Sequence, residues 1–124
     1  MRIAGLAFVL ALAAATSAAA APRLLVGVTE DGLKYEPDAV RRDAKAAGLH
    51  AVRITLGWRS GQTAPSAEER AELERATSGA GPLRVVLSVF GEHAADAPQT
   101  EDARDAYCEF LRSIVARYPR IRLT

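Results

Sequence analysis

The chain has 124 residues, of which 49% are hydrophobic and 25% charged, and its formal net charge is +1. These values are ordinary for one soluble domain. The sixteen basic and fifteen acidic side chains are spread along the chain without a block of one sign. Such a distribution lacks the electrostatic footprint of a protein that binds nucleic acid or an anionic membrane surface, so we expect neither partner.

The start of the chain has the composition of a secretory signal peptide. A short positive start and an apolar run that ends at Ala15 are followed by small residues, and cleavage after Ala20 fits the small-x-small rule. The apolar run is shorter than the roughly 20 residues of a spanning helix. We therefore expect residues 1–20 to be a cleaved leader and residues 21–124 to be one secreted domain, extracellular or periplasmic. An uncleaved membrane anchor is the alternative.

Residues 24–56 predict a strand, a helix and a second strand with short connections. The run LLVGV, residues 24–28, has the length of a buried strand, and a polar turn follows it. Pro37 suits the first turn of a helix whose apolar residues recur at helical spacing, and Gly48 suits its C-terminal cap. This pattern predicts a right-handed unit with parallel strands.

The run HAVRITLGW, residues 50–58, contains an arginine in an otherwise apolar strand. Aliphatic residues alternate with Arg53 and Thr55, so Arg53 is expected to face away from the aliphatic row. A strand flanked by helices is typical of a parallel sheet covered by those helices, and then the Arg53 face is enclosed too. An enclosed guanidinium needs an anionic partner. The alternative is an edge-strand arginine that reaches solvent.

A second helix and a third strand follow. Ser66 and Glu69 form an S-x-x-E capping pattern at the start of the helix, and residues 79–82 are expected to end it. The run LRVVLSVF, residues 83–90, predicts the third strand, and a polar loop comes after it. The sequence thus repeats the alternation of strand and helix that is typical of a parallel sheet.

A third helix has the clearest apolar face of the chain. Thr100 is its expected N-cap, Pro119 ends it, and residues 120–124 resume a strand-like alternation. Cys108, the sole cysteine, is expected to be a small half-buried side chain of this helix. Three such βα units leave a helix face and two strand edges uncovered.

The succession of VGVTEDG, AAGLHAVRITLGW, LRVVLSVFG and AYCEFLRSIVARYP resembles the N-terminal part of secreted clan A glycoside hydrolases, the TIM-barrel group that includes family 5 cellulase-like enzymes. The similarity covers residues 24–121. In that family the second strand carries an arginine in a V-R-I-x-x-x-W setting, which residues 52–58 match with Arg53. A helix that ends in Y-P typically leads into the fourth strand of the barrel.

The resemblance implies an α/β fold, a partial TIM (β/α)8 barrel of about the first three βα units, that hydrolyses O-glycosyl bonds in polysaccharide or oligosaccharide without a cofactor. It implies a supporting role for Arg53 beside the nucleophile carboxylate. The family's acid/base glutamate belongs to an N-E-P motif on the fourth strand and its nucleophile to the seventh, and neither occurs in these 124 residues. A full barrel takes about 250 residues. We therefore expect the chain alone to be inactive.

Residues at the C-terminal ends of the strands are the expected substrate contacts, because barrel active sites form there. Trp58 is either a sugar-stacking platform or a plain packing tryptophan. Glu92 and His93 after the third strand, and Glu30 after the first, either bind sugar hydroxyls or are solvated loop residues. The two histidines, His50 and His93, lack the spacing of metal ligands, so no metal site is expected.

Two other interpretations stay open. The chain could be a non-catalytic secreted module that binds carbohydrate, or a half-barrel that self-associates through its open sheet edges. It could also be a gene fragment without a folded product. Turnover would depend on Arg53, whereas sugar binding alone would depend on Trp58. Specificity for one sugar or linkage lies in all eight loops of such a barrel, of which this chain supplies three.

Overall fold

The computed structural model describes residues 24–124, and the expected leader, residues 1–20, lies outside the described residues. The elements in chain order are β1 (Gly27–Thr29), the short 3-10 helix η1 (Asp31–Lys34), α1 (Pro37–Ala46), β2 (Ala51–Trp58), α2 (Ala67–Gly79), β3 (Arg84–Gly91), the short 3-10 helix η2 (Ala94–Asp96), α3 (Glu101–Arg117) and β4 (Arg122–Leu123). The fold is therefore α/β, as the alternation of patterns predicts.

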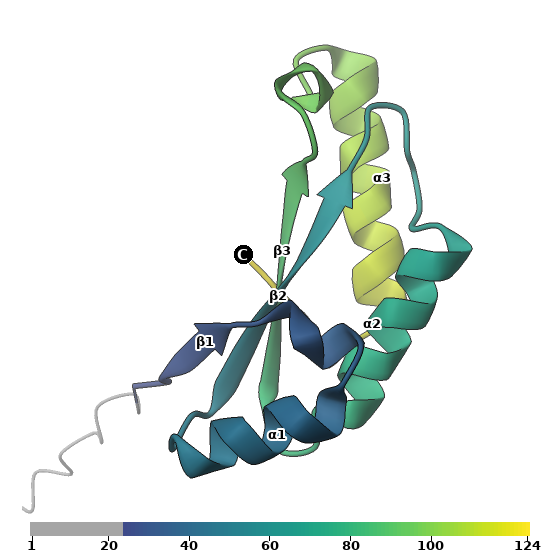
Figure 1. The fold of residues 1–124 in the computed structure, drawn as a ribbon. Helices are drawn as coiled ribbons and strands as arrows, with labels where there is room; N and C mark the ends of the chain where they lie inside the picture. Colours follow the sequence, from purple (N-terminus) through teal and green to yellow (C-terminus); the bar gives the residue numbers. More distant parts are fainter. Residues whose placement is uncertain (1–23) are drawn as a thin grey trace, which may run out of the picture.

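The four strands form one parallel sheet in the order β1-β2-β3-β4. Strands that follow one another along the chain are therefore also neighbours in the sheet. Right-handed crossovers that always step in the same direction leave every connecting helix on the same side. Figure 1 shows α1, α2 and α3 on one side of the sheet, and no helix of residues 24–124 lies on the other.

The hydrophobic core lies between the sheet and this helix layer. Alternate residues of β2 and β3 point into it, and buried residues of all three helices meet them: Val52, Ile54, Leu56, Trp58, Val85, Leu87, Ala44, Leu73, Ala76, Phe110 and Ile114. Arg53 is exposed and faces away from this core, as the period-two pattern predicts.

The prediction that helices enclose the Arg53 face is wrong. All helices pack on the opposite face, because the strand order is sequential. The alternative of an edge-strand arginine is also wrong, since β2 lies between β1 and β3. Arg53 reaches solvent from an inner strand.

The local helix signals are confirmed. Ser66 and Glu69 form a reciprocal capping box at the start of α2, and Thr100 accepts the amide of Ala103 at the start of α3. Gly48 has a φ of +68° just after α1, the left-handed conformation expected of a glycine that terminates a helix. Among residues 24–124 no helix is both long and apolar enough to cross a membrane.

Three details differ from the sequence-based expectations. The first strand is shorter than the apolar run LLVGV predicts. Only Gly27, Val28 and Thr29 pair with β2. Helix α2 continues through Gly79. Cys108 is exposed, so the prediction of a half-buried thiol is wrong. The unpredicted turn η1 is the difference that matters most for the candidate site.

Candidate functional site

The face of the sheet that carries no described helix holds most of the polar side chains of the strands. The register brings these residues to it: Thr29, Arg53, Thr55, Gly57, Arg84, Val86, Ser88, Phe90 and Arg122. We call this surface the open face. Arg53 donates a hydrogen bond from Nη2 to Ser88 Oγ at 2.7 Å. The partner of the guanidinium is thus a neutral hydroxyl and not the carboxylate that an enclosed arginine would require.

Side chains of η1 replace β1 along part of the β2 edge. The ladder of β1 ends at Thr29, opposite Arg53. Beyond that point, Asp31 Oδ1 accepts the amide of Thr55 at 2.7 Å, and Asp31 Oδ2 accepts its hydroxyl. Lys34 Nζ donates to the carbonyl of Thr55 at 3.1 Å. The backbone groups that the short strand leaves unpaired are therefore satisfied by one acidic and one basic side chain.

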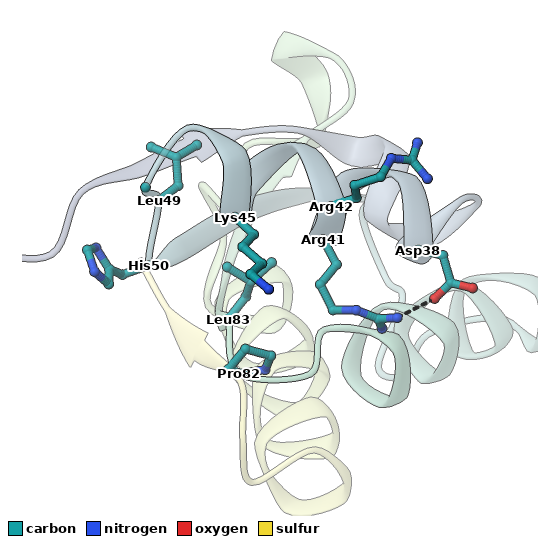
Figure 2. A pocket seen from close by; sticks show the side chains of 9 residues that line it. Asp38, Arg41, Arg42, Lys45, Leu49, His50, Pro82 and Leu83 are labelled. Atoms are coloured by element: carbon teal, nitrogen blue, oxygen red, sulfur yellow. Dashed lines mark hydrogen bonds and ion pairs between the residues drawn. The ribbon is translucent and has the colours of Figure 1, made fainter.

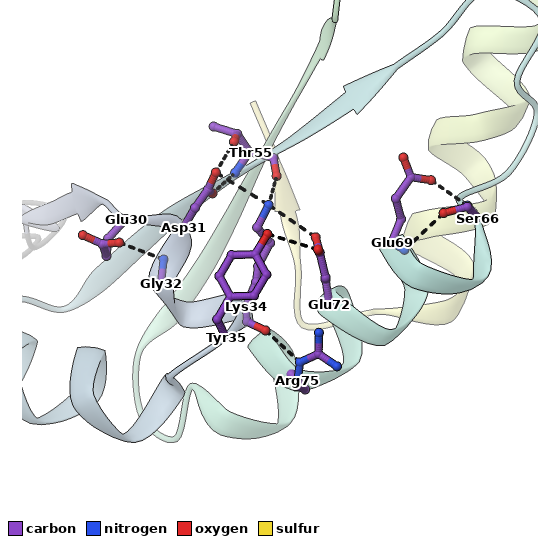
Figure 3. A network of polar contacts seen from close by, with 10 residues as sticks. All are labelled: Glu30, Asp31, Gly32, Lys34, Tyr35, Thr55, Ser66, Glu69, Glu72 and Arg75. Atoms are coloured by element: carbon purple, nitrogen blue, oxygen red, sulfur yellow. Dashed lines mark hydrogen bonds and ion pairs between the residues drawn. The ribbon is translucent and has the colours of Figure 1, made fainter.

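Lys34 is the most buried charged residue of this network, with 7% of its surface exposed. Its Nζ lies 3.6 Å from Asp31 Oδ2 and 3.5 Å from Glu72 Oε2 of α2. Tyr35 Oη donates to Glu72 Oε1 at 3.1 Å, and Arg75 Nε donates to the carbonyl of Lys34 at 2.8 Å. Figure 3 shows these groups converging between η1, β2 and α2. The network ties the loop after β1 to both the sheet and the helix layer.

These contacts shift two pKa values. Burial acts to raise the pKa of Asp31, but the two hydrogen bonds from Thr55 and the positive charge of Lys34 outweigh it, so the pKa lies below its ordinary value of 3.8. Burial, followed by the hydrogen bond to Glu72, raises the pKa of the Tyr35 hydroxyl. Asp31 is therefore held as a carboxylate, and its lone pairs are directed at Thr55.

At the C-terminal end of the sheet, Glu92 lies across the open face. A Cβ added to Gly57 would meet Glu92 Cγ at 2.5 Å, so the absence of a side chain at Gly57 makes room for the glutamate. Arg59 Nε is 3.3 Å from Glu92 Oε2, and both side chains are accessible to solvent. This carboxylate and its arginine are a solvent-accessible ion pair at the expected substrate end.

Asp96 joins the loops after β2 and β3. Asp96 Oδ2 accepts the amide of His93 at 3.0 Å, and Asp96 Oδ1 accepts the amide of Ser60 at 3.1 Å. His93 is exposed. Glu30, in contrast, uses its carboxylate as the N-cap of η1, where Oε1 accepts the amide of Gly32 at 2.7 Å. Three polar residues were expected to contact substrate. Glu92 and His93 lie around the same cavity, whereas the Glu30 carboxylate caps η1.

Trp58 packs in the core, as the second of its two interpretations predicts. It is fully buried, its Nε1 donates to the carbonyl of Gln62 at 2.7 Å, and its ring meets Tyr107 edge-on at 5.1 Å between centroids. Its indole face is thus not free for a sugar ring. Phe90 is instead the aromatic side chain on the open face, with 48% of its surface exposed.

A cavity of about 490 Å³ lies at this end of the strands. The residues around it include Phe90, Glu92, His93 and Tyr107. Its lining therefore combines aromatic residues with one acidic residue and one histidine, a composition that suits a ligand with both apolar faces and hydroxyl groups. The exposure of Phe90 on the open face could have been predicted from the sequence, because residues two apart in a strand lie on the same face and Ser88 is polar.

A second cavity, of about 660 Å³, lies at the opposite, N-terminal end of the strands. Figure 2 shows Arg41, Arg42 and Lys45 of α1 around it, together with His50 just before β2. Arg41 is engaged, since it donates to the carbonyl of Gly79 at 2.8 Å and to Asp38 at 2.7 Å. His50 lines this cavity, whereas His93 lines the cavity at the C-terminal end of the strands.

Within residues 24–124 no group of three or more histidine, cysteine or acidic side chains is arranged to hold a metal ion. Comparisons of the chain with protein-family models, with curated proteins and with solved structures found no match.

Proposed function

We propose that this chain is the N-terminal part of a secreted TIM-barrel glycoside hydrolase that acts on O-glycosyl bonds of a polysaccharide or oligosaccharide. The observation that carries the proposal is the sequential parallel order β1-β2-β3-β4 with all helices on one face. A (β/α)8 barrel has this order, with its helices outside. A doubly wound sheet reverses its order at a switch point and has helices on both faces.

Under this proposal the open face is the part of the barrel wall that faces inward. Arg53 would stand beside the nucleophile carboxylate, which a strand outside these 124 residues would supply. An adjacent guanidinium favours the ionised form of a carboxylate and forms charge-assisted hydrogen bonds with it. The exposure of Arg53 and its single neutral partner, Ser88, leave donor groups available for such a contact.

Phe90, Glu92 and His93 are the proposed substrate contacts. They line the cavity at the C-terminal end of the strands, where the loops of a barrel bind substrate. Phe90 offers a partly exposed ring for stacking against a sugar. Glu92 would accept hydrogen bonds from sugar hydroxyl groups, and its carboxylate also pairs with Arg59.

The first experiment reads the coding DNA beyond the codon for Thr124 in all three frames. A strand that ends in N-E-P supports the proposal, and sequence without any further βα pattern would contradict it. The chain is then assayed for release of reducing sugar from soluble glucan, xylan and mannan. Retaining hydrolysis needs two carboxyl groups about 5 Å apart, so the 124 residues alone should give no product. Joined with the downstream segment they should, and Arg53→Met should abolish that activity.

A second candidate function is carbohydrate binding without turnover, which the half-exposed Phe90 on the open face favours. Affinity electrophoresis in polysaccharide gels distinguishes the two functions. If the protein only binds, Phe90→Ala should abolish retardation of the isolated chain while Arg53→Met leaves it unchanged. A chain that shows no retardation in any gel would exclude this candidate.

A further inference from the structure

The cavity of about 660 Å³ at the N-terminal end of the strands lies between complete elements of the chain. One wall is α1 with the turn after it, and the other is the connection between α2 and β3. Figure 2 shows Arg41 and Lys45 on the first wall and Pro82 and Leu83 on the second. No residue of the edge strands β1 and β4 lines this cavity, so its shape does not depend on what covers those edges.

Backbone hydrogen bonds fix both walls. In the turn after α1, the amide of Leu49 donates to the carbonyl of Ala44 at 2.8 Å. His50 is held through its amide and its carbonyl, in hydrogen bonds of 2.8 and 3.0 Å. On the opposite wall, the amide of Leu83 donates to the carbonyl of Ala80 at 3.1 Å. A ligand would therefore enter a preformed cavity and lose little free energy in ordering the backbone.

The apolar part of the lining is aliphatic. It consists of Leu49, Pro82 and Leu83, and no Phe, Tyr or Trp of the described chain lines the cavity. The cavity at the other end of the strands differs, because Phe90 and Tyr107 lie around it. A sugar ring stacks on an aromatic face, whereas a hydrocarbon chain gains from contact with any apolar surface. The N-terminal cavity therefore suits an alkyl group better than a sugar.

Two of the arginines around the cavity already have acidic partners. Asp38, the one acidic residue of the lining, accepts a hydrogen bond from Arg41 at 2.7 Å, so its charge is balanced. Arg42 Nε lies 3.6 Å from Asp43 Oδ1, and Figure 2 shows the Arg42 side chain pointing away from Lys45. These pairs leave the remaining charge of the cavity to Lys45 and His50.

Lys45 and His50 have no acidic partner among residues 24–124. Both are exposed, and neither takes part in an ion pair of this part of the chain. Lys45 brings one permanent positive charge, and the imidazole of His50 can donate a hydrogen bond. A single anionic group next to an apolar chain would complement both parts of the lining.

We propose that the N-terminal cavity binds an alkyl anion, a hydrocarbon chain that ends in one carboxylate, sulfate or phosphate group. The anionic group lies beside Lys45 and His50. The chain lies against Leu49, Pro82 and Leu83. Such a molecule occurs free in solution or as a lipid of a membrane. The proposal rests on this cavity alone and does not require hydrolase activity, since a barrel binds its substrate at the opposite end of the strands.

The probe is octanoate, titrated into the ¹⁵N-labelled chain at neutral pH. The expected result is saturable amide shifts centred on Gly48, Leu49, His50 and Leu83. Octanol and octylamine have the same chain without the negative charge and should bind at least threefold more weakly. From hexanoate to decanoate the affinity should rise, by up to about fourfold for each added methylene. Absence of saturable shifts, or equal binding of octanol and octanoate, would overturn the proposal.

Variants locate the anionic group. Lys45→Met keeps an apolar side chain of similar length and removes the charge, so octanoate should bind at least threefold more weakly and octanol unchanged. Arg112→Met makes the same change of charge at an exposed position of α3 and should affect neither ligand. Equal losses of octanoate affinity in both variants would mean general charge attraction and would overturn the proposal. If Lys45→Met does not fold, His50→Gln replaces it, and unchanged octanoate affinity then counts against the proposal.

The two sources of an alkyl anion are separated by sedimentation with vesicles of phosphatidylcholine and phosphatidylglycerol. Octanoate binding without sedimentation assigns the cavity to a free molecule. Octanoate binding together with sedimentation that Lys45→Met abolishes assigns it to a membrane lipid. Sedimentation without octanoate binding would mean recognition of a charged surface and would overturn the proposal. None of these outcomes bears on the hydrolase proposal, whose tests concern the opposite end of the strands.

Discussion

Arg53 and Ser88 meet on the open face of the sheet, where Arg53 Nη2 donates to Ser88 Oγ at 2.7 Å. The strand register pairs Arg53 with Val86, so Ser88 is its diagonal neighbour on β3. A cation on an inner strand is thus held by a hydroxyl group alone, which the structure permits because water reaches this face.

Replacing Arg53 should hardly change stability. Arg53→Met removes one hydrogen bond between exposed groups, so the free energy of unfolding should change by less than about 1 kcal/mol. Urea denaturation of the variant beside Ser88→Ala measures this, and the two changes should be similar in size. A loss above about 2 kcal/mol would show that Arg53 has a stabilising partner other than Ser88.

Replacing Lys34 should be far more costly. Lys34→Met leaves the carboxylates of Asp31 and Glu72 without their shared cation and the carbonyl of Thr55 without a donor. Broken buried ion pairs cost about 3 to 5 kcal/mol, and the partial exposure of Asp31 reduces this to about 2 kcal/mol. Lys45→Met, at an exposed position of α1, should stay within about 0.5 kcal/mol. Equal urea midpoints for the two variants would contradict a stabilising role for the network.

Asp31 should make stability depend on pH in the acid range. Its pKa in the folded chain lies below the ordinary 3.8, so the unfolded chain binds a proton more readily. Its contribution is complete well above pH 3.8, declines as the pH falls below that value, and is lost once the pH passes the lowered folded pKa. Asp31→Asn should therefore flatten the acid limb of the unfolding free energy against pH. Asp43→Asn, exposed on α1, should keep the wild-type slope.

Gly79→Ala should destabilise the protein although alanine favours helices. Alanine in a helix interior normally gains about 1 kcal/mol over glycine. Here the added Cβ would come within 2.7 Å of Cγ of Pro37, a rigid ring in the first turn of α1, so α1 and α2 would have to separate. The expected net loss is about 1 to 3 kcal/mol. Ser78→Ala at the preceding, exposed position should be neutral or stabilising, and a higher melting temperature for Gly79→Ala would refute the close contact.

Trp58 should behave as a core residue in solution. It is the sole tryptophan, so its fluorescence reports on this position alone. Acrylamide should quench the folded chain weakly, and soluble oligosaccharides should leave the emission unchanged. Trp58→Ala should cost about 3 to 5 kcal/mol, and Trp58→Phe less. Strong quenching in the folded chain would mean that the indole is accessible after all.

The helices and the orientation of the strands could be predicted because their signals are local. The capping pair Ser66 and Glu69 spans one helical turn, and the period of two separates Arg53 from the aliphatic row within a single strand. The same period also carries Trp58 into the buried row, in line with Ile54 and Leu56. Its position at the end of the strand suggested a platform, but the face on which a side chain emerges decides its exposure.

The network around Lys34 could not be predicted in the same way. Lys34 and Asp31 lie in a polar turn that gives no periodic signal, and Glu72 is one of several acidic residues on α2. Their shared role follows from the early end of β1, which leaves the backbone of Thr55 to be satisfied by side chains. Only the packing of η1 against β2 and α2 brings them together.

The sequence by itself determined the order of the three main helices and of the strands, and that Arg53 turns away from the core, because propensity, capping and side-chain period act within a few residues. The tertiary structure decided that the Arg53 face is open and that it gathers Arg84 and Arg122. Which face the helices cover depends on the order of the strands and the hand of each crossover. Those are relationships between distant segments, and no local pattern encodes them.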